Sequence, residues 1–349
     1  MKKFLSVLLV LLMLFSAMRT DFQYSRVFAD LDETASDTSS WDIFNYIALP
    51  SMRGIATAVY DNKIYVGGRY DASNQTYVFD GFNWAAGGNL PDLRRNTSFA
   101  VFNGDIYCAG GTNGSGGTAD TTWKLVDGVW EDQGKTLPNG GITVPGLVPF
   151  TVSGTDYLYV VGGYRVTGRN DVYRFDGDSW TDITATDGLP YANQTGQGVV
   201  ALGGRIYVTA LDNGTKVYSY DGTGDAGEKW TAEPSLPSAI SGLHTTFDYN
   251  GKIYVVGGDN SSGGGYVFSW TPGDASWQTE TSIPSPRYRH GRAVLNDHIY
   301  IIGGATTSGG DASNQVFRYP GSVLSTTEGT YVGGDTLTLK GYDLKKDMT

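Results

Sequence analysis

Paired glycines recur through most of this 349-residue chain at a nearly constant spacing. The pairs are Gly67-Gly68, Gly110-Gly111, Gly162-Gly163, Gly257-Gly258 and Gly303-Gly304. A sixth position, Thr209-Ala210, lacks the glycines but follows a similar apolar run. The second residues of these six positions are separated by 43, 52, 47, 48 and 46 residues. This period fits a unit of four short strands and excludes the shorter helical repeats.

Aromatic residues follow each of these positions in the same order. The first aromatic residues are Tyr77, Trp123, Tyr173, Tyr218, Tyr266 and Phe317. In five units a tryptophan comes next, at Trp84, Trp130, Trp180, Trp230 and Trp277. The chain has 49 glycines and only 17% charged residues, as many short strands joined by tight turns would require. We therefore predict an all-β fold made of repeated strand units.

These residues resemble the kelch repeat, and the resemblance extends from roughly Trp41 to Pro320. It implies that each unit is a four-stranded blade of a β-propeller, the fold of the galactose oxidase-like superfamily. Glycines at the end of the second strand would allow positive φ and close approach of the next blade. The aromatic side chains would fill the wedge between blades, which widens outward.

The sixth unit has no tryptophan after Phe317, but one additional tryptophan, Trp41, lies before the first unit. Trp41 precedes Leu49-Pro50 as Trp84 precedes Leu90-Pro91. We predict that residues 41–45 supply the outer strand of the last blade and close a ring of six blades. Residues 41–320 then form one domain, because a blade cannot bury its faces alone.

The two ends of the chain differ from the repeats. Residues 1–29 combine Lys2-Lys3, an apolar run and Val27-Phe28-Ala29, which is typical of a secretory signal peptide. Residues 30–40 are acidic and Ser/Thr-rich, as in a flexible leader. Residues 321–349 indicate either the start of an immunoglobulin-like module or a β-rich tail. We expect a secreted or cell-surface monomer with no membrane span after cleavage.

The net charge of −11 argues against a nucleic-acid partner, because phosphate binding uses clustered Lys and Arg. The single cysteine, Cys108, lies in an apolar strand and is predicted to be a small core residue.

Basic residues gather in the segments that lead into the first strand of each unit. These segments contain five arginines and two of the three histidines. The candidate ligand-binding residues are Arg53, Arg94, Arg95, Asn96, Asn193, His244, Arg287, Tyr288, Arg289 and His290. The arginines fall in consecutive blades, so they could converge on a carboxylate, which matches the two-donor guanidinium fork. The alternative is local packing, because Pro286 to Gly291 resembles the ordinary repeat consensus.

The sequence has too few candidate ligands for a catalytic copper site. Galactose oxidase uses copper with two histidines, two tyrosines and a cross-linked cysteine, whereas this chain offers only His244, His290, Tyr288 and Cys108. The repeated pentapeptide at residues 71–75 and 311–315 could offer oxygens to calcium, but turn formation by its asparagines explains it better. We expect no metal and no cofactor.

Two functions fit this sequence. The first is an exported module that binds a carbohydrate or protein at the loops. The second, implied by resemblance to six-bladed sialic-acid mutarotases, is a sugar-epimerising enzyme with His290 or a nearby carboxylate as acid–base group.

Overall fold

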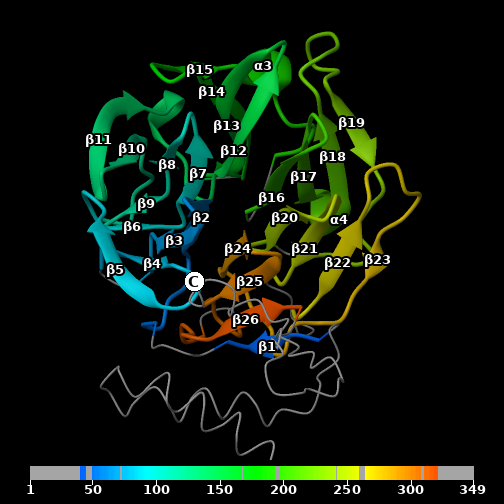
Figure 1. Ribbon diagram of the computed structural model, residues 1–349. Coiled ribbons are helices and arrows are strands. Elements are labelled where there is room, and N and C mark those ends of the chain that lie inside the picture. The colour runs from blue at the N-terminus through cyan, green and yellow to red at the C-terminus, as the bar shows by residue number, and fades with distance from the viewer. Residues whose placement is uncertain are drawn as a thin grey trace, which may run out of the picture. The chain divides into compact units, whose positions relative to one another are not determined.

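The computed structural model describes residues 40–44, 49–70, 73–166, 168–192, 196–240, 242–258, 264–307 and 310–320. These residues form six four-stranded antiparallel sheets around a common axis (Figure 1). The prediction of a six-bladed, nearly all-β propeller is therefore confirmed. The predicted signal peptide, the leader through Ser39, Asn193 and the C-terminal segment lie outside the described residues.

Each blade begins at the axis and adds strands outward. Blade one contains β2 (Ala56–Tyr60), β3 (Lys63–Gly67), β4 (Gln75–Phe79) and β5 (Trp84–Asn89). Blade two contains β7 (Ser98–Phe102), β8 (Asp105–Ala109), β10 (Thr121–Val126) and β11 (Val129–Thr136). Blade three contains β12 (Gly146–Val152), β13 (Thr155–Tyr164), β14 (Gly168–Phe175) and β15 (Trp180–Asp182).

The remaining blades repeat this order. Blade four contains β16 (Gly198–Leu202), β17 (Arg205–Leu211), β18 (Lys216–Tyr220) and β19 (Trp230–Glu233). Blade five contains β20 (Thr245–Tyr249), β21 (Lys252–Val256), β22 (Val267–Trp270) and β23 (Gln278–Thr279). Blade six contains β24 (Gly291–Leu295), β25 (His298–Ile302), β26 (Val316–Tyr319) and β1 (Asp42–Ile43). The first strands of adjacent blades contact one another around the axis.

Strand β1 closes the ring as predicted. It pairs antiparallel with β26, with Asp42 opposite Arg318. Their side chains form an ion pair at 3.2 Å, and the Trp41 ring centroid lies 5.2 Å from that of Tyr319. Asn45, predicted to end this strand, lies outside the described residues.

The core is divided among the interfaces between blades. Six buried clusters each combine side chains from two neighbouring blades, as Phe79 and Tyr300 do between blades one and six. The outer-strand tryptophans reach back to the preceding blade. The indole N–H of Trp180 donates to the Thr122 hydroxyl at 2.8 Å, and that of Trp277 donates to the Pro234 carbonyl at 2.8 Å. The tryptophans thus fill the wedge and also link the blades.

The connections gather on one side of the propeller. Segments leading into first strands pair with segments leaving second strands, for example Met52 with Ser313 and Thr143 with Tyr164. A two-stranded sheet of β6 (Arg94–Arg95) and β9 (Thr112–Asn113) is made in the same way. We call this side the loop face. The remaining elements are the short helices η1 (Pro138–Gly140), α3 (Thr184–Asp187) and α4 (Asp212–Thr215). Among the described residues, no helix is long and apolar enough to cross a membrane.

The glycine positions adopt the conformation that only glycine adopts easily. Gly258 has φ +111° and Gly163 has φ +120°. At the position without glycines, Ala210 keeps the left-handed conformation with φ +60°. A side chain in this region costs about 1–2 kcal/mol. At this position blade four therefore contains backbone strain that the glycines of the other five blades avoid.

Replacing Ala210 by glycine is expected to stabilise the propeller by about 0.5–1 kcal/mol, because relief of strain exceeds the added entropy of the unfolded chain. Urea unfolding would measure the gain. Gly258→Ala is the matched control, since its new Cβ would lie 2.4 Å from Ile240 Cγ2 and should destabilise the protein. A loss of stability in Ala210→Gly would contradict the strain argument.

Candidate functional site

A ring of six residues surrounds the axis on the loop face, one from each blade. Each stands two residues before the first strand of its blade, and each has a positive φ between +48° and +94°. The six are Gly54, Asn96, Val144, Gly196, Leu243 and Arg289. Five backbone hydrogen bonds of 2.8–3.0 Å join neighbouring members, such as Gly54 N–H to the Arg289 carbonyl. We call this feature the backbone ring.

The backbone ring fixes the residues that carry the site. Left-handed conformations of non-glycine residues are rare, and a β-branched residue such as Val144 at φ +48° is a marked outlier. Such strain persists only where the surroundings determine the conformation. Here the hydrogen bonds between blades do so, and the loop face therefore has a rigid centre.

Three arginines lie around one tyrosine beside this ring. The guanidinium carbons of Arg95, Arg53 and Arg289 lie 4.4, 4.9 and 5.0 Å from the centroid of the Tyr70 ring. The Tyr70 N–H donates to the Arg53 carbonyl at 2.9 Å. We call Tyr70 and these three arginines the arginine cluster. It joins three consecutive blades, because the arginines precede the first strands of blades one, two and six.

The position of Tyr70 is set by close packing. Gly54 separates the Tyr70 ring from the Asn96 amide, and a Cβ at this glycine would lie 2.8 Å from Asn96 Oδ1. Asn96 Oδ1 and Arg289 Nε are both buried without a hydrogen-bond partner. These two polar atoms add one unused acceptor and one unused donor beside the cluster.

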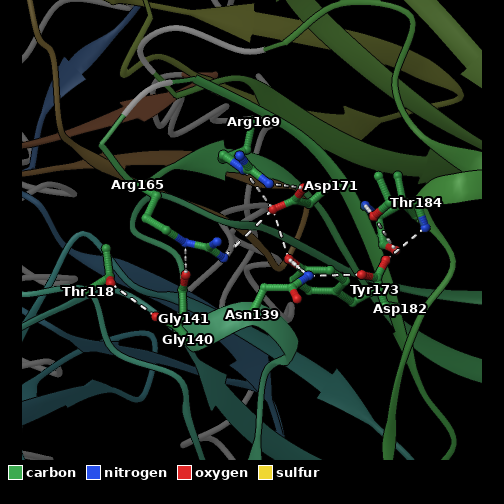
Figure 2. Close-up of polar contacts among 11 residues, drawn as sticks. Thr118, Asn139, Gly140, Gly141, Arg165, Arg169, Asp171, Tyr173, Asp182 and Thr184 are labelled. Atoms are coloured by element: carbon green, nitrogen blue, oxygen red, sulfur yellow. Dashed lines mark hydrogen bonds and ion pairs between the residues drawn. The ribbon is translucent and has the colours of Figure 1, made fainter.

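None of the ion pairs between described residues involves an arginine of the cluster. A second group of arginines on blade three shows the contrast (Figure 2). Arg169 binds both carboxylate oxygens of Asp171, at 2.9 and 3.0 Å. Arg165 lies 3.8 Å from the same carboxylate, which also accepts from the Tyr173 hydroxyl at 2.8 Å. The two blade-three arginines thus share one carboxylate, whereas no described carboxylate forms an ion pair with the cluster.

The cluster changes the acidity of its tyrosine. Burial raises the pKa of Tyr70, but a hydrogen bond with Arg289 and the charges of all three arginines outweigh burial and lower the pKa below its usual value. The site therefore favours negative charge at its centre.

Two of the predicted arginines do not join the cluster. Arg94 is 3% exposed and donates to the Gly110 carbonyl and the Thr121 hydroxyl at 2.9 Å. Arg287 is 2% exposed, and its guanidinium binds Ser285 and Gln315 and lies over the Phe317 ring. Both groups are occupied by the protein's own acceptors. For these residues the structure supports the alternative of local packing.

The other predicted residues surround the axis or lie behind the cluster. Tyr288 is buried and lies 5.7 Å from the Arg289 guanidinium, and Asn96 belongs to the backbone ring. His244 and His290 line a central channel of about 150 Å³ together with residues from all six blades. Tyr70 was missed by the sequence reasoning. Its position in the loop after the second strand of blade one was the signal that could have found it.

The two channel histidines are buried and neutral. His244 Nε2 accepts from Gly198 N–H at 3.1 Å, and His290 Nε2 lies 3.0 Å from the Thr245 hydroxyl. Burial lowers the pKa of His244 to about 4. Burial, with the charges of His244 and Arg287, lowers the pKa of His290 to about 3. An acid–base role for His290 is therefore disfavoured.

These histidines should make the protein acid-sensitive. Their folded pKa values lie below the unfolded value near 6.5, so the unfolded state takes up protons first. The resulting loss of stability should begin as pH falls below about 6.5 and continue towards pH 4, with each histidine contributing on the order of 3 kcal/mol. Urea unfolding at pH 7, 6, 5 and 4.5 should show a flatter pH dependence in His244→Gln/His290→Gln. Equal slopes in both proteins would contradict this assignment.

Cys108 is a buried core residue, as predicted. Burial raises the pKa of its thiol to about 11, so the reactive thiolate is disfavoured. In the described part of the chain, no group of three or more His, Cys, Asp or Glu could hold a metal ion.

Comparison with known proteins gives distant relatives. No protein-family model matches the chain. It is 23% identical over 272 residues to beta-scruin of Limulus polyphemus, covering 71% of this chain and 29% of that protein. It is 24% identical over 250 residues to kelch domain-containing protein 3 of Rattus norvegicus, covering 63% of each. The chain thus spans less than two thirds of the length of either relative.

A solved structure shares the fold. The structure of YjhT superposes with a TM-score of 0.61 at 16% identity, covering 79% of this chain and 96% of that one. At this identity the likeness concerns the fold alone.

Proposed function

Because this chain is a kelch-repeat β-propeller, we propose that it is a binding module whose loop face recognises a carbohydrate or protein ligand through a carboxylate. Kelch propellers commonly serve as protein-binding modules. The arginine cluster is the observation that supports an anionic ligand here. Three guanidinium groups converge on Tyr70 without an ion pair to any described residue. Arg53 also donates to the Gly310 carbonyl and Arg289 is hydrogen-bonded to Tyr70. Arg95 can therefore offer a carboxylate two parallel N–H donors, and the other two arginines can add single donors and charge.

The other parts of the site fit the same ligand. Tyr70 holds the three guanidinium groups together through its ring and its hydrogen bond with Arg289. The backbone ring holds these groups in place before binding, which lowers the entropic cost of association.

Arg95→Gln tests this proposal. No described residue accepts a hydrogen bond from the Arg95 guanidinium, so removing that group should leave the fold intact. On an array of uronic-acid and sialic-acid glycans, matched neutral glycans and acidic peptides, the wild type should bind acidic probes. Loss of one charge-assisted contact should weaken binding about 10- to 100-fold. Added salt should also weaken it.

Lys216→Gln serves as the control, since it removes one positive charge outside the cluster at an exposed position. It should bind as the wild type does. Acidic-probe binding that ignores Arg95→Gln, or binding confined to neutral probes, would refute the proposed site.

A second candidate function is a sugar-epimerising enzyme of the sialic-acid mutarotase type. Tyr70 favours it, because a phenol of lowered pKa beside three arginines could move a proton on a carboxylate-bearing sugar. In this role Tyr70 replaces the buried His290 as acid–base group. NMR exchange between sialic acid anomers should then accelerate with the wild type and not with Tyr70→Phe. Absence of acceleration by the wild type would leave only the binding module.

We also propose that the protein is exported and acts as a monomer outside the cell. The proposal rests on the basic and apolar pattern of residues 1–29. Expression of the full chain in a secreting host should release a protein whose N-terminal sequence begins after Ala29 or Ala17. Retention of the uncleaved chain inside the cell would contradict it.

A further inference from the structure

The central channel has an unbalanced charge. Each blade contributes four successive residues to its lining, beginning with the member of the backbone ring. The described lining residues include Arg289 and Arg292 but no aspartate or glutamate. This is unexpected in a chain with a net charge of −11. The Arg289 guanidinium lies over Tyr70 in the arginine cluster, which leaves Arg292 as the cation of the channel itself.

The backbone of Arg292 is fixed by the neighbouring blade. The Thr57 hydroxyl accepts from Arg292 N–H at 3.2 Å and donates to the Arg292 carbonyl. These bonds hold the start of β24 against β2 across the interface between blades six and one. The position of Arg292 on the channel wall is therefore fixed, because both its N–H and its carbonyl bond to the Thr57 hydroxyl.

The Arg292 guanidinium has no ion pair within the part of the chain that the structure describes. Burial lowers its pKa, and the charge of Asp248 only partly offsets this. Asp248 is exposed near the far end of β20. Of the other strands beside β24, β2 carries no formal charge and β25 carries only His298. Among the described strands packed against β24, only β20 carries an opposite charge, Asp248, and it forms no ion pair with Arg292.

We propose that the central channel binds a small inorganic anion, such as chloride, beside Arg292. Arg292 is partly buried in the wall of the channel and has no ion pair to a described residue. A bound anion would offset the cost of keeping this charge partly out of water. The channel, with an accessible volume of about 150 Å³, has room for a small anion and several waters. This site is distinct from the arginine cluster and does not depend on the function proposed for it.

The thermal midpoint of the full chain in sodium chloride, compared with sodium isethionate at equal ionic strength, measures this binding. Chloride should raise Tm by about 2–5 °C relative to isethionate in the wild type, because a ligand that binds only the folded state stabilises it. The difference should vanish in Arg292→Gln and persist in Arg292→Lys, which retains the charge. It should also persist in Arg53→Gln/Arg95→Gln, which alters only the arginine cluster. Isethionate binding at the cluster would affect the wild type and Arg292→Gln equally.

Crystals soaked in sodium bromide give a second measurement that needs no variant. An anomalous peak in the channel within hydrogen-bond distance of the Arg292 guanidinium is expected. Peaks only at the arginine cluster or at lattice contacts would overturn the proposal. So would an equal chloride effect in Arg292→Gln, or no effect in the wild type.

Discussion

Burial between blades is the constraint on which this structure depends. A four-stranded blade has two apolar faces, and each face is covered only by the next blade. All six buried clusters of the described residues lie across such an interface. The ring must therefore close, and β1 closes it by pairing with β26. The indole N–H groups of Trp180 and Trp277 add directional contacts to this packing, because they donate from one blade to the preceding one.

The rigid ring also explains how positive charges can be concentrated on an acidic protein. The first strands of all blades meet at the axis, so the residues just before them meet as well. The backbone ring holds these residues in left-handed conformations that separate loops would not retain. Mutual repulsion among three guanidinium groups is then opposed by the fold and by the face of Tyr70. Asp171 pairs with both arginines of blade three, whereas no described carboxylate forms an ion pair with the cluster on blades one, two and six.

The architecture could be predicted from the sequence because the same order of apolar run, turn and aromatic residue recurs in six units. The number of glycine positions predicted the number of blades. Trp41, which precedes the first unit, predicted that an N-terminal strand closes the ring. The site was predicted only in part, for reasons of side-chain direction. Arg94 and Arg95 are adjacent on β6, so one points into the blade and the other to the loop face. The spacing of residues in the sequence does not show which of the two arginines faces the loop side.

The conformation of the backbone ring also changes which way side chains point, compared with an extended strand. Arg287 and Arg289 would share one side of an extended strand, but the left-handed φ of Arg289 redirects its side chain. Tyr70 lies in a loop whose length varies between units, where periodicity carries no signal. Tertiary contacts, and not local pattern, decide which arginines remain available.

The antiparallel pairing of β1 with β26 has a further consequence. Because Trp41 lies beside Tyr319, the polypeptide enters and leaves the propeller at neighbouring points. β26 starts at the loop face and runs away from it, so both points lie on the opposite side of the disc. The strands at which the chain enters and leaves the propeller are therefore anchored on the side opposite the arginine cluster, and that cluster is clear of both connections.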